Sequence, residues 1–92
     1  MMSQIPINLA KLGQKELDKE ILRTGMIAEL DAISLYEQMA AMTKDAGIKA
    51  ILLDIAKEEK THVGEFQALL LKNDKEQEKE LKAGKAEVDE KT

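Results

Sequence analysis

The sequence contains no cysteine and no tryptophan, and only one tyrosine, one phenylalanine and one proline among its 92 residues. Without cysteine the chain can form no disulfide, offers no thiolate to a metal and has no thiol nucleophile. The aromatic content of 2% disfavours a β-sandwich, whose strands are rich in aromatic and β-branched side chains. Any metal would be bound by oxygen and imidazole alone, which favours iron or manganese and leaves zinc as a further candidate.

The chain also lacks any apolar run that approaches the roughly 20 residues of a membrane span. Its N-terminus has no basic region followed by an apolar segment, so we expect no secretory signal. The net charge at pH 7 is -4, which is unfavourable for a nucleic-acid groove. We therefore expect neither a membrane nor a nucleic acid among its partners.

Charged residues make up 35% and hydrophobic residues 43% of the chain, a balance typical of amphipathic helices. Apolar residues at helical spacing predict helices over 14–43 and 48–72, and the short turn between them makes these helices antiparallel neighbours. Asp74 with Gln77 resembles a capping box, so we expect a short third helix over 75–83. The expected fold class is all-α, an antiparallel two-helix hairpin with a short C-terminal helix.

A chain of this length forms one small domain, and we divide it into three segments. Residues 1–13 are expected to be a flexible leader, which Pro6 punctuates. Residues 14–83 hold the helical hairpin and the third helix. Residues 84–92 form a charged tail with little to bury, which we expect to be mobile.

Two stripes with steps of three and four residues run along the two long helices. The first stripe comprises Leu22, Met26, Glu29, Ile33, Tyr36 and Ala40, and the second comprises Leu52, Ile55, Glu59, His62, Phe66 and Leu69. Glu59 and His62 interrupt an apolar face, where a charge is costly unless something pairs with it. Their i, i+3 spacing points both side chains at one place. Gly25, inside the first helix, indicates either a close helix approach or a tolerated weak spot.

In a helical hairpin, residues equally far from the turn lie at the same height. The midpoint of positions 29 and 62 falls inside the turn, and the midpoint of 29 and 59 lies within one helical turn of it. We therefore expect Glu29, Glu59 and His62 to converge about 25 Å from the loop. The alternative is that His62 lies at a helix edge with a hydrogen bond, and Glu59 in water.

Two helices cannot enclose a core, and the chain is short for independent stability. A di-iron carboxylate bundle takes one Glu from each of two helices and a Glu-x-x-His motif from each of the other two. This chain carries one of each, in Glu29 and in Glu59 with His62. Two copies would supply the full set, so we expect a homodimer with the metal site at the subunit interface.

With these residues identified, the chain resembles the encapsulated ferritins, ferritin-like half-bundles that are the cargo of encapsulin nanocompartments. The resemblance covers about 21–81 and is close to the ferritin-like domain that some archaea fuse directly to an encapsulin shell. It rests on Ile27-Ala28-Glu29-Leu30-Asp31-Ala32 with Tyr36-Glu37, on Ile51-Leu52-Leu53-Asp54-Ile55-Ala56, and on Glu58-Glu59-Lys60-Thr61-His62.

The resemblance implies that Glu29, Glu59 and His62 bind iron at a ferroxidase centre in a four-helix bundle formed by two subunits. Tyr36 would be an aromatic neighbour of that centre; a core aromatic without such a role is the alternative. The family implies a ring of dimers, a decamer, that delivers oxidised iron inside an encapsulin shell in the cytoplasm. Asp31 would serve iron access, although Ala28 replaces an acid that some members have.

Many family members end in a short apolar peptide that docks into the shell. Residues 83–92 carry little apolar surface beyond Ala86 and Val88, so no docking peptide is evident there. Glu58 and Glu65 are each expected on a solvated helix face, with a place beside an iron path as the alternative for Glu65.

Three other functions remain open from the sequence. A peroxide-reducing di-iron protein would use the same ligands, but the cysteine-bound iron of the rubrerythrins cannot form without cysteine. A helical adaptor would use Glu59 and His62 as a buried polar pair that specifies register. A zinc-stabilised hairpin would bind Zn(II) without redox chemistry.

Overall fold

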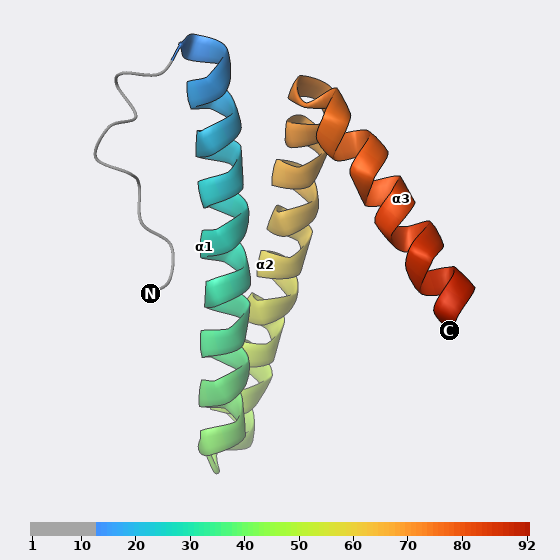
Figure 1. Cartoon of the computed structure of the whole chain (residues 1–92). Coiled ribbons are helices and arrows are strands. Elements are labelled where there is room, and N and C mark those ends of the chain that lie inside the picture. Colours follow the sequence, from blue (N-terminus) through green and yellow to red (C-terminus); the bar gives the residue numbers. More distant parts are fainter. Residues whose placement is uncertain (1–12) are drawn as a thin grey trace.

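The computed structural model describes residues 13–92, which form three helices and no strand: α1 (Gln14–Met42), α2 (Ala46–Asn73) and α3 (Lys75–Lys91). Helices α1 and α2 lie side by side as an antiparallel hairpin, and α3 leaves the far end of α2 at an angle (Figure 1). The predicted all-α hairpin with a C-terminal helix is therefore confirmed. The leader predicted over 1–13 lies outside the described residues, apart from Gly13.

Aspartate side chains cap the beginnings of α2 and α3. Asp45 Oδ1 accepts a hydrogen bond from the backbone N–H of Ile48 at 2.9 Å, and Asp74 Oδ1 accepts one from the N–H of Gln77 at 3.0 Å. Each bond pairs an N–H group that has no partner inside the first turn of its helix. Asp74, the capping residue expected from the sequence, therefore begins α3, and Asp45 caps α2 in the same way.

Helix α3 is longer than the predicted 75–83, because it continues through Gly84 to Lys91. None of the described glycines has a positive φ, so Gly84 stays in the helical path and does not end the helix. Lys85 Nζ lies 2.7 Å from Asp89 Oδ2, one helical turn further on, and this ion pair spans the last turns of α3. The mobility expected for residues 84–92 stays a prediction.

Asp74 also joins α3 to the hairpin. Its Oδ2 lies 2.9 Å from the Arg23 guanidinium, which reaches it from α1. The hydrogen bond from the Gln77 N–H is the main cause that holds the pKa of Asp74 below 3.8, and the positive charges of Lys19 and Arg23 lower that pKa further against the opposing effect of desolvation. One carboxylate therefore caps α3 and ties its first turn to α1.

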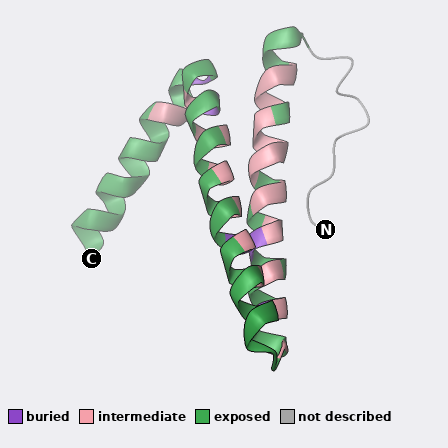
Figure 2. Cartoon of the chain, turned by 180° about the vertical axis from the view of Figure 1, so that it is seen from behind, coloured by how far each residue is buried: buried purple, intermediate pink, exposed green. Residues whose placement is uncertain are grey.

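The buried apolar core is small and lies between α1 and α2. It consists of Ile33 and Ala40 on α1, and Ala56 and Leu70 on α2. Partly buried residues follow the facing sides of the hairpin, whereas α3 is almost wholly exposed (Figure 2). The accessible surface of the chain is 7069 Å², against about 5,400 Å² for a compact monomer of this mass, so the chain exposes more surface than a compact fold would.

The packed seam between α1 and α2 follows the two predicted stripes, except that Ala56 and Leu70, which lie outside the stripes, are also buried. Leu69, expected to face inward, is 49% exposed, and its neighbour Leu70 is 3% exposed instead. A helix of 3.6 residues per turn drifts away from a strict seven-residue repeat, so the inward position moves by one residue along α2. Leu70 therefore closes the seam at the far end of the hairpin.

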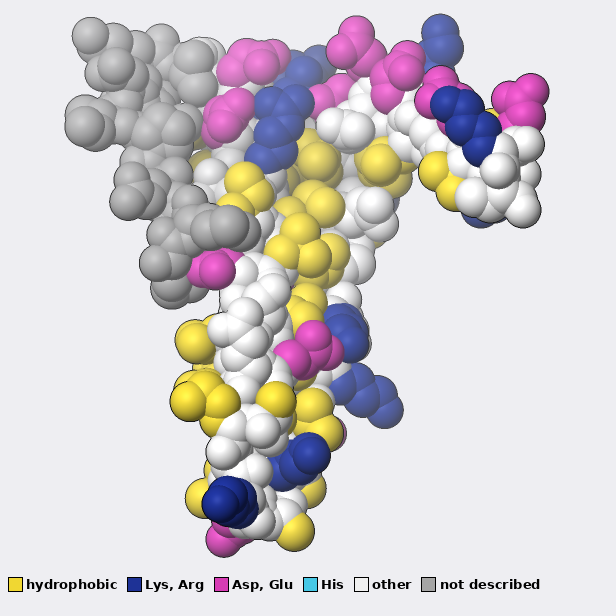
Figure 3. Space-filling view, turned by 60° about the horizontal axis from the view of Figure 1, so that its bottom comes forward, with side chains coloured by type: hydrophobic (Ala, Val, Ile, Leu, Met, Phe, Trp, Pro, Cys, Tyr) yellow, Lys and Arg dark blue, Asp and Glu magenta, His cyan; other side chains and the backbone are white. Residues whose placement is uncertain are grey.

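Large apolar side chains remain exposed along both helices of the hairpin. They include Ile21, Ile27, Leu30, Leu35 and Met42 of α1, and Ile48, Ile51, Leu53 and Leu69 of α2. Figure 3 shows apolar side chains reaching the surface along the hairpin, with charged side chains on α3. No helix within residues 13–92 is long and apolar enough to cross a membrane. The hairpin by itself therefore leaves a large part of its apolar surface uncovered, as is typical of an interaction surface.

Candidate metal centre

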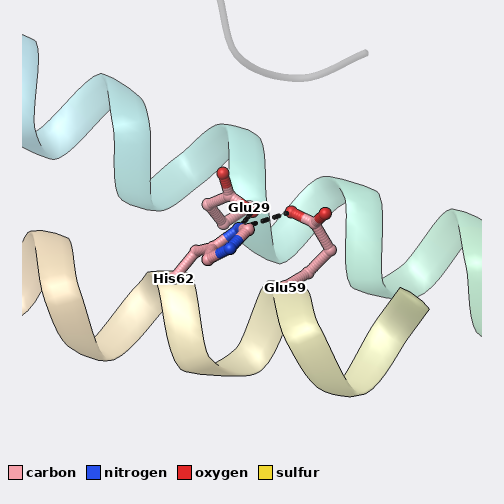
Figure 4. Close-up of side chains that lie close together, drawn as sticks. All are labelled: Glu29, Glu59 and His62. Atoms are coloured by element: carbon pink, nitrogen blue, oxygen red, sulfur yellow. Dashed lines mark ion pairs between the residues drawn. The ribbon is translucent and has the colours of Figure 1, made fainter. Parts of the chain in front are cut away.

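Three potential metal ligands meet between α1 and α2, and all three are the residues expected from the sequence. Glu29 projects from α1, and Glu59 and His62 project toward it from successive turns of α2 (Figure 4). One ligand atom from each residue lies within 4.8 Å of the other two. The antiparallel hairpin therefore brings Glu29 to the same point as two residues that follow it by 30 and 33 positions.

The imidazole lies almost midway between the two carboxylates. His62 Nδ1 is 3.4 Å from Glu29 Oε2 and 3.5 Å from Glu59 Oε2. The side chains of Glu29 and Glu59 are 20% and 19% exposed, whereas that of His62 is 44% exposed. The alternative that Glu59 lies in water is therefore wrong, and the acids lie deeper than the imidazole.

Glu29 Oε2 is buried and accepts no hydrogen bond, although it lies at ion-pair distance from the imidazole. A buried oxygen without a donor loses the hydrogen bonds that it makes in water. Two carboxylates about 5 Å apart also repel each other by about 3 kcal/mol at an effective dielectric constant of 20. A cation between them would remove both penalties, so the donor set fits a metal ion.

The chemistry of the donors narrows the choice of metal. Two carboxylate oxygens and one imidazole nitrogen suit iron, manganese and zinc, whereas no thiolate is available to favour a softer ion. Three side chains leave coordination positions open, so a single chain would bind a metal incompletely. The further ligands must come from water, substrate or a second chain.

A cavity of about 360 Å³ adjoins the ligands. Glu29 and His62 border it together with Glu65, Phe66 and Leu69 from the following turns of α2. Glu65 is exposed, as expected, and also faces this cavity, so its side chain could meet an ion that approaches the ligands. Glu58 is exposed but does not border the cavity.

The structure does not bring Tyr36 or Asp31 into the ligand cluster. Tyr36 is half-buried on the same stripe, but it lies seven positions beyond Glu29, about 10 Å along α1. Asp31 is half-buried and is not part of the group of potential ligands. Their roles beside the metal and in iron access stay predictions.

Reasoning from the sequence named Gly25 and Phe66 separately but missed the contact between them, which adjoins this region. A Cβ atom on Gly25 would lie 2.7 Å from Cε1 of Phe66, so the ring of Phe66 rests on the backbone of α1. The rule that paired Glu29 with His62 also pairs Gly25 with Phe66, because both pairs share one midpoint in the turn. Of the two explanations for Gly25, a close helix approach is therefore confirmed.

Comparison with known proteins agrees with the fold and the motifs. The model of the family described as EncFtn-like matches residues 5–85. This chain belongs to the EncFtn-like family. A crystal structure of the encapsulated ferritin domain from Pyrococcus furiosus superposes with a TM-score of 0.85 at 56% identity, over 98% of this chain and 94% of that one. The predicted relationship to the encapsulated ferritins is confirmed.

A longer relative shows the setting in which a similar domain occurs. The ferritin-like-encapsulin shell fusion protein of Pyrococcus furiosus is 59% identical to this EncFtn-like chain over 86 residues. Those residues are 94% of this chain but 25% of the fusion protein. The chain thus spans about a quarter of the length of the relative that it matches.

Proposed function

We propose that this chain is a ferroxidase that oxidises Fe(II) to Fe(III) at a di-iron site formed between two subunits. The observation that carries the proposal is the convergence of Glu29, Glu59 and His62 around a buried carboxylate oxygen that has no hydrogen-bond donor. Membership of the EncFtn-like family supports the choice of iron and of the reaction. Iron is here the substrate, and the protein supplies its ligands.

The incompleteness of the single chain supports a homodimer. One hairpin offers three ligands and leaves large apolar side chains exposed along α1 and α2. Two hairpins related by a two-fold axis would form a four-helix bundle with four glutamates and two histidines, the ligand set of di-iron carboxylate proteins. Four carboxylates offset the charge of two Fe(II) ions, which makes their burial tolerable. Dimers would assemble further into a ring, as the decamer expected from the resemblance.

The residues of the site have separate tasks in the proposed reaction. His62 and Glu59 bind one iron from one helix, and Glu29 completes or bridges the coordination from the other helix. Ligands of oxygen and imidazole favour Fe(III) over Fe(II), so each iron readily gives one electron to dioxygen or peroxide. Tyr36 would adjoin the centre, and Asp31 would help iron to reach it.

Iron storage in an encapsulin compartment is the setting that we propose for this activity. The relative from Pyrococcus furiosus carries a ferritin-like domain fused to an encapsulin shell. By analogy, the partner of this chain is an encapsulin shell protein, and its place is inside that compartment in the cytoplasm. Co-expression with a candidate shell protein, followed by purification of intact shells, tests this partnership.

Native mass spectrometry after anaerobic loading with Fe(II) tests the proposed function. Two irons per dimer, together with rapid oxidation when oxygen or peroxide is added, is the expected result. The variant His62→Ala should lose both, while His62 lies far enough from the caps and α3 to leave the helices intact. A dimer that binds no iron would favour the adaptor, and tight Zn(II) binding without oxidation would favour the zinc-stabilised hairpin.

A further inference from the structure

We infer that Gly25 and Phe66 form a spacer that sets the separation of α1 and α2 at the metal ligands. Gly25 is thus a positioning residue, which acts on Glu29 and His62 without touching the metal. The metal-dependent part of this inference rests on the proposed function. The spacer itself rests on the packing of the hairpin.

The contact between the two residues is tight over much of the ring. A Cβ atom built on Gly25 would lie 2.7 Å from Phe66 Cε1, and 2.9 Å from both Cδ1 and Cζ. Non-bonded carbon atoms prefer separations of about 3.5–4.0 Å. Only a residue without a Cβ atom lets the ring lie this close to the backbone of α1.

The spacer lies one helical turn from the ligands on both helices. Gly25 precedes Glu29 by four residues, and Phe66 follows His62 by four residues, so each pair shares one helix face. The ring of Phe66 also borders the cavity that Glu29 and His62 line. The position of this ring therefore affects both the helix separation and the space beside the ligands.

A methyl group at position 25 would have to displace the ring. The ring can move away from α1 by pushing the helices apart, which separates Glu29 from His62. It can instead swing into the cavity, which fills the space beside both ligands. Bonds from metal to nitrogen or oxygen ligands vary by only about 0.2 Å, so either movement disturbs the coordination.

The other glycines of the hairpin provide an internal contrast. A Cβ atom on Gly64 would have no heavy atom within 4 Å, although this residue lies only two positions after His62. Gly64→Ala is therefore a matched control for Gly25→Ala, since both add one methyl group within a helix near the site. Only the change at position 25 should affect the site.

The sequence supplies a direct reporter for the metal-free protein. His62 is the sole histidine and Phe66 the sole phenylalanine of the chain, so proton NMR identifies the signals of both rings without further labelling. In Gly25→Ala we expect both sets of ring signals to shift, whereas Gly64→Ala should leave them near their wild-type positions. Unchanged ring signals in Gly25→Ala would overturn the spacer, whether or not the protein binds metal.

Titration with Co(II), followed by visible absorption, tests the effect on coordination. We expect Gly25→Ala to weaken Co(II) binding about tenfold and to change the absorption bands, with helicity by circular dichroism retained. The double variant Gly25→Ala with Phe66→Leu should recover affinity, because the smaller side chain makes room for the methyl group. Wild-type affinity in Gly25→Ala, or equal losses in both alanine variants, would refute the positioning role.

The proposed function can fail separately from the spacer. If the wild-type protein binds no Co(II), but the ring signals shift in Gly25→Ala and not in Gly64→Ala, the metal site is refuted and the spacer is supported.

Discussion

The hairpin and the α3 arm are both helical, yet they are stabilised differently. The hairpin contains every buried apolar residue of the described chain, and α3 contains none. In the hairpin, the contacts between α1 and α2 join residues far apart in the sequence. Within α3, the ion pairs join residues only three or four positions apart. The arm is a helix by local propensity, and the hairpin is ordered by packing.

This difference explains where the candidate chemistry lies. Packing α1 against α2 removes Glu29 and Glu59 from water and leaves Glu29 Oε2 without a donor. No carboxylate of α3 is buried, and Glu78 and Asp89 pair with nearby lysines, so these acids have no comparable need for a cation. Any affinity of this cluster for a metal would therefore come from the packing of α1 against α2 and not from the acidic residues as such.

The largest expected effect comes from breaking the packing of the hairpin. Ile33→Ala should lower the free energy of unfolding by about 2–4 kcal/mol, because it removes a buried side chain from a small core. Val88→Ala in α3 removes an exposed side chain and should change that free energy by less than about 0.5 kcal/mol. Urea unfolding measures both variants, and equal losses would mean that α3 shares the core.

A second variant should separate the stability of the hairpin from its function. Glu29→Gln removes one charge from the partly buried pair of carboxylates, so the metal-free protein should become more stable by about 1–3 kcal/mol at pH 8. The same change should abolish stabilisation by Fe(II), because an amide would replace a carboxylate ligand of the proposed site.

Thermal unfolding with and without anaerobic Fe(II) measures the two effects of Glu29→Gln together. The control is Glu58→Gln, which removes an exposed carboxylate next to Glu59 and should alter neither melting temperature. Metal-free Glu29→Gln that is less stable than the wild type would show that its carboxylate is already satisfied.

Lowering the pH should weaken the contacts of Asp74 at the start of α3 before it affects the packing of α1 against α2. The pKa of Asp74 is lowered in the folded protein, chiefly by the hydrogen bond from the Gln77 N–H. The unfolded state therefore binds a proton more readily, and the stabilisation is fully present above the ordinary pKa of 3.8. It is lost as the pH falls below 3.8 through the lowered pKa.

Hydrogen exchange of the α3 amides between pH 5 and pH 2, corrected for intrinsic rates, measures this loss. Asp74→Ala should show weak protection of the first turn of α3 at every pH, because both the cap and the Arg23 contact are missing. Protection that falls with acid in the variant as steeply as in the wild type would assign the pH dependence to another group.

The smallest expected effect is confined to the arm. Gly84→Ala should stabilise the middle of α3 by up to about 1 kcal/mol, since nothing lies within 4 Å of the added methyl group and alanine favours a helix. Hydrogen exchange should slow in α3 alone, with no change in the urea midpoint of the hairpin. A shifted midpoint would show that the two regions unfold together.

Much of the hairpin and of the candidate site could be predicted from the sequence. Asp45 and Asp74 act as caps because short side chains at these positions reach the backbone locally, without help from the fold. Glu29, Glu59 and His62 converge because a short turn fixes which residues of the two helices lie at equal height. Both inferences need only local geometry and helix dimensions.

Other features were set by interactions that the same reasoning did not weigh. The helix continues through Gly84 because its neighbours and their ion pairs outweigh the cost of one glycine. Leu70 replaces Leu69 in the core because the exact rotation of α2 depends on its packing against α1. The pair of Arg23 with Asp74 depends on the angle at which α3 leaves α2.

The sequence by itself determined the two helices of the hairpin, their antiparallel order, the level of the candidate ligands and the membership of a family that the comparisons then showed. Only the tertiary structure decided how deeply Glu29 is buried, and that Phe66 lies against the backbone at Gly25. Helix formation and height in a hairpin follow from spacing along one chain. Burial and close approach depend on how two surfaces fit, and spacing does not specify that fit.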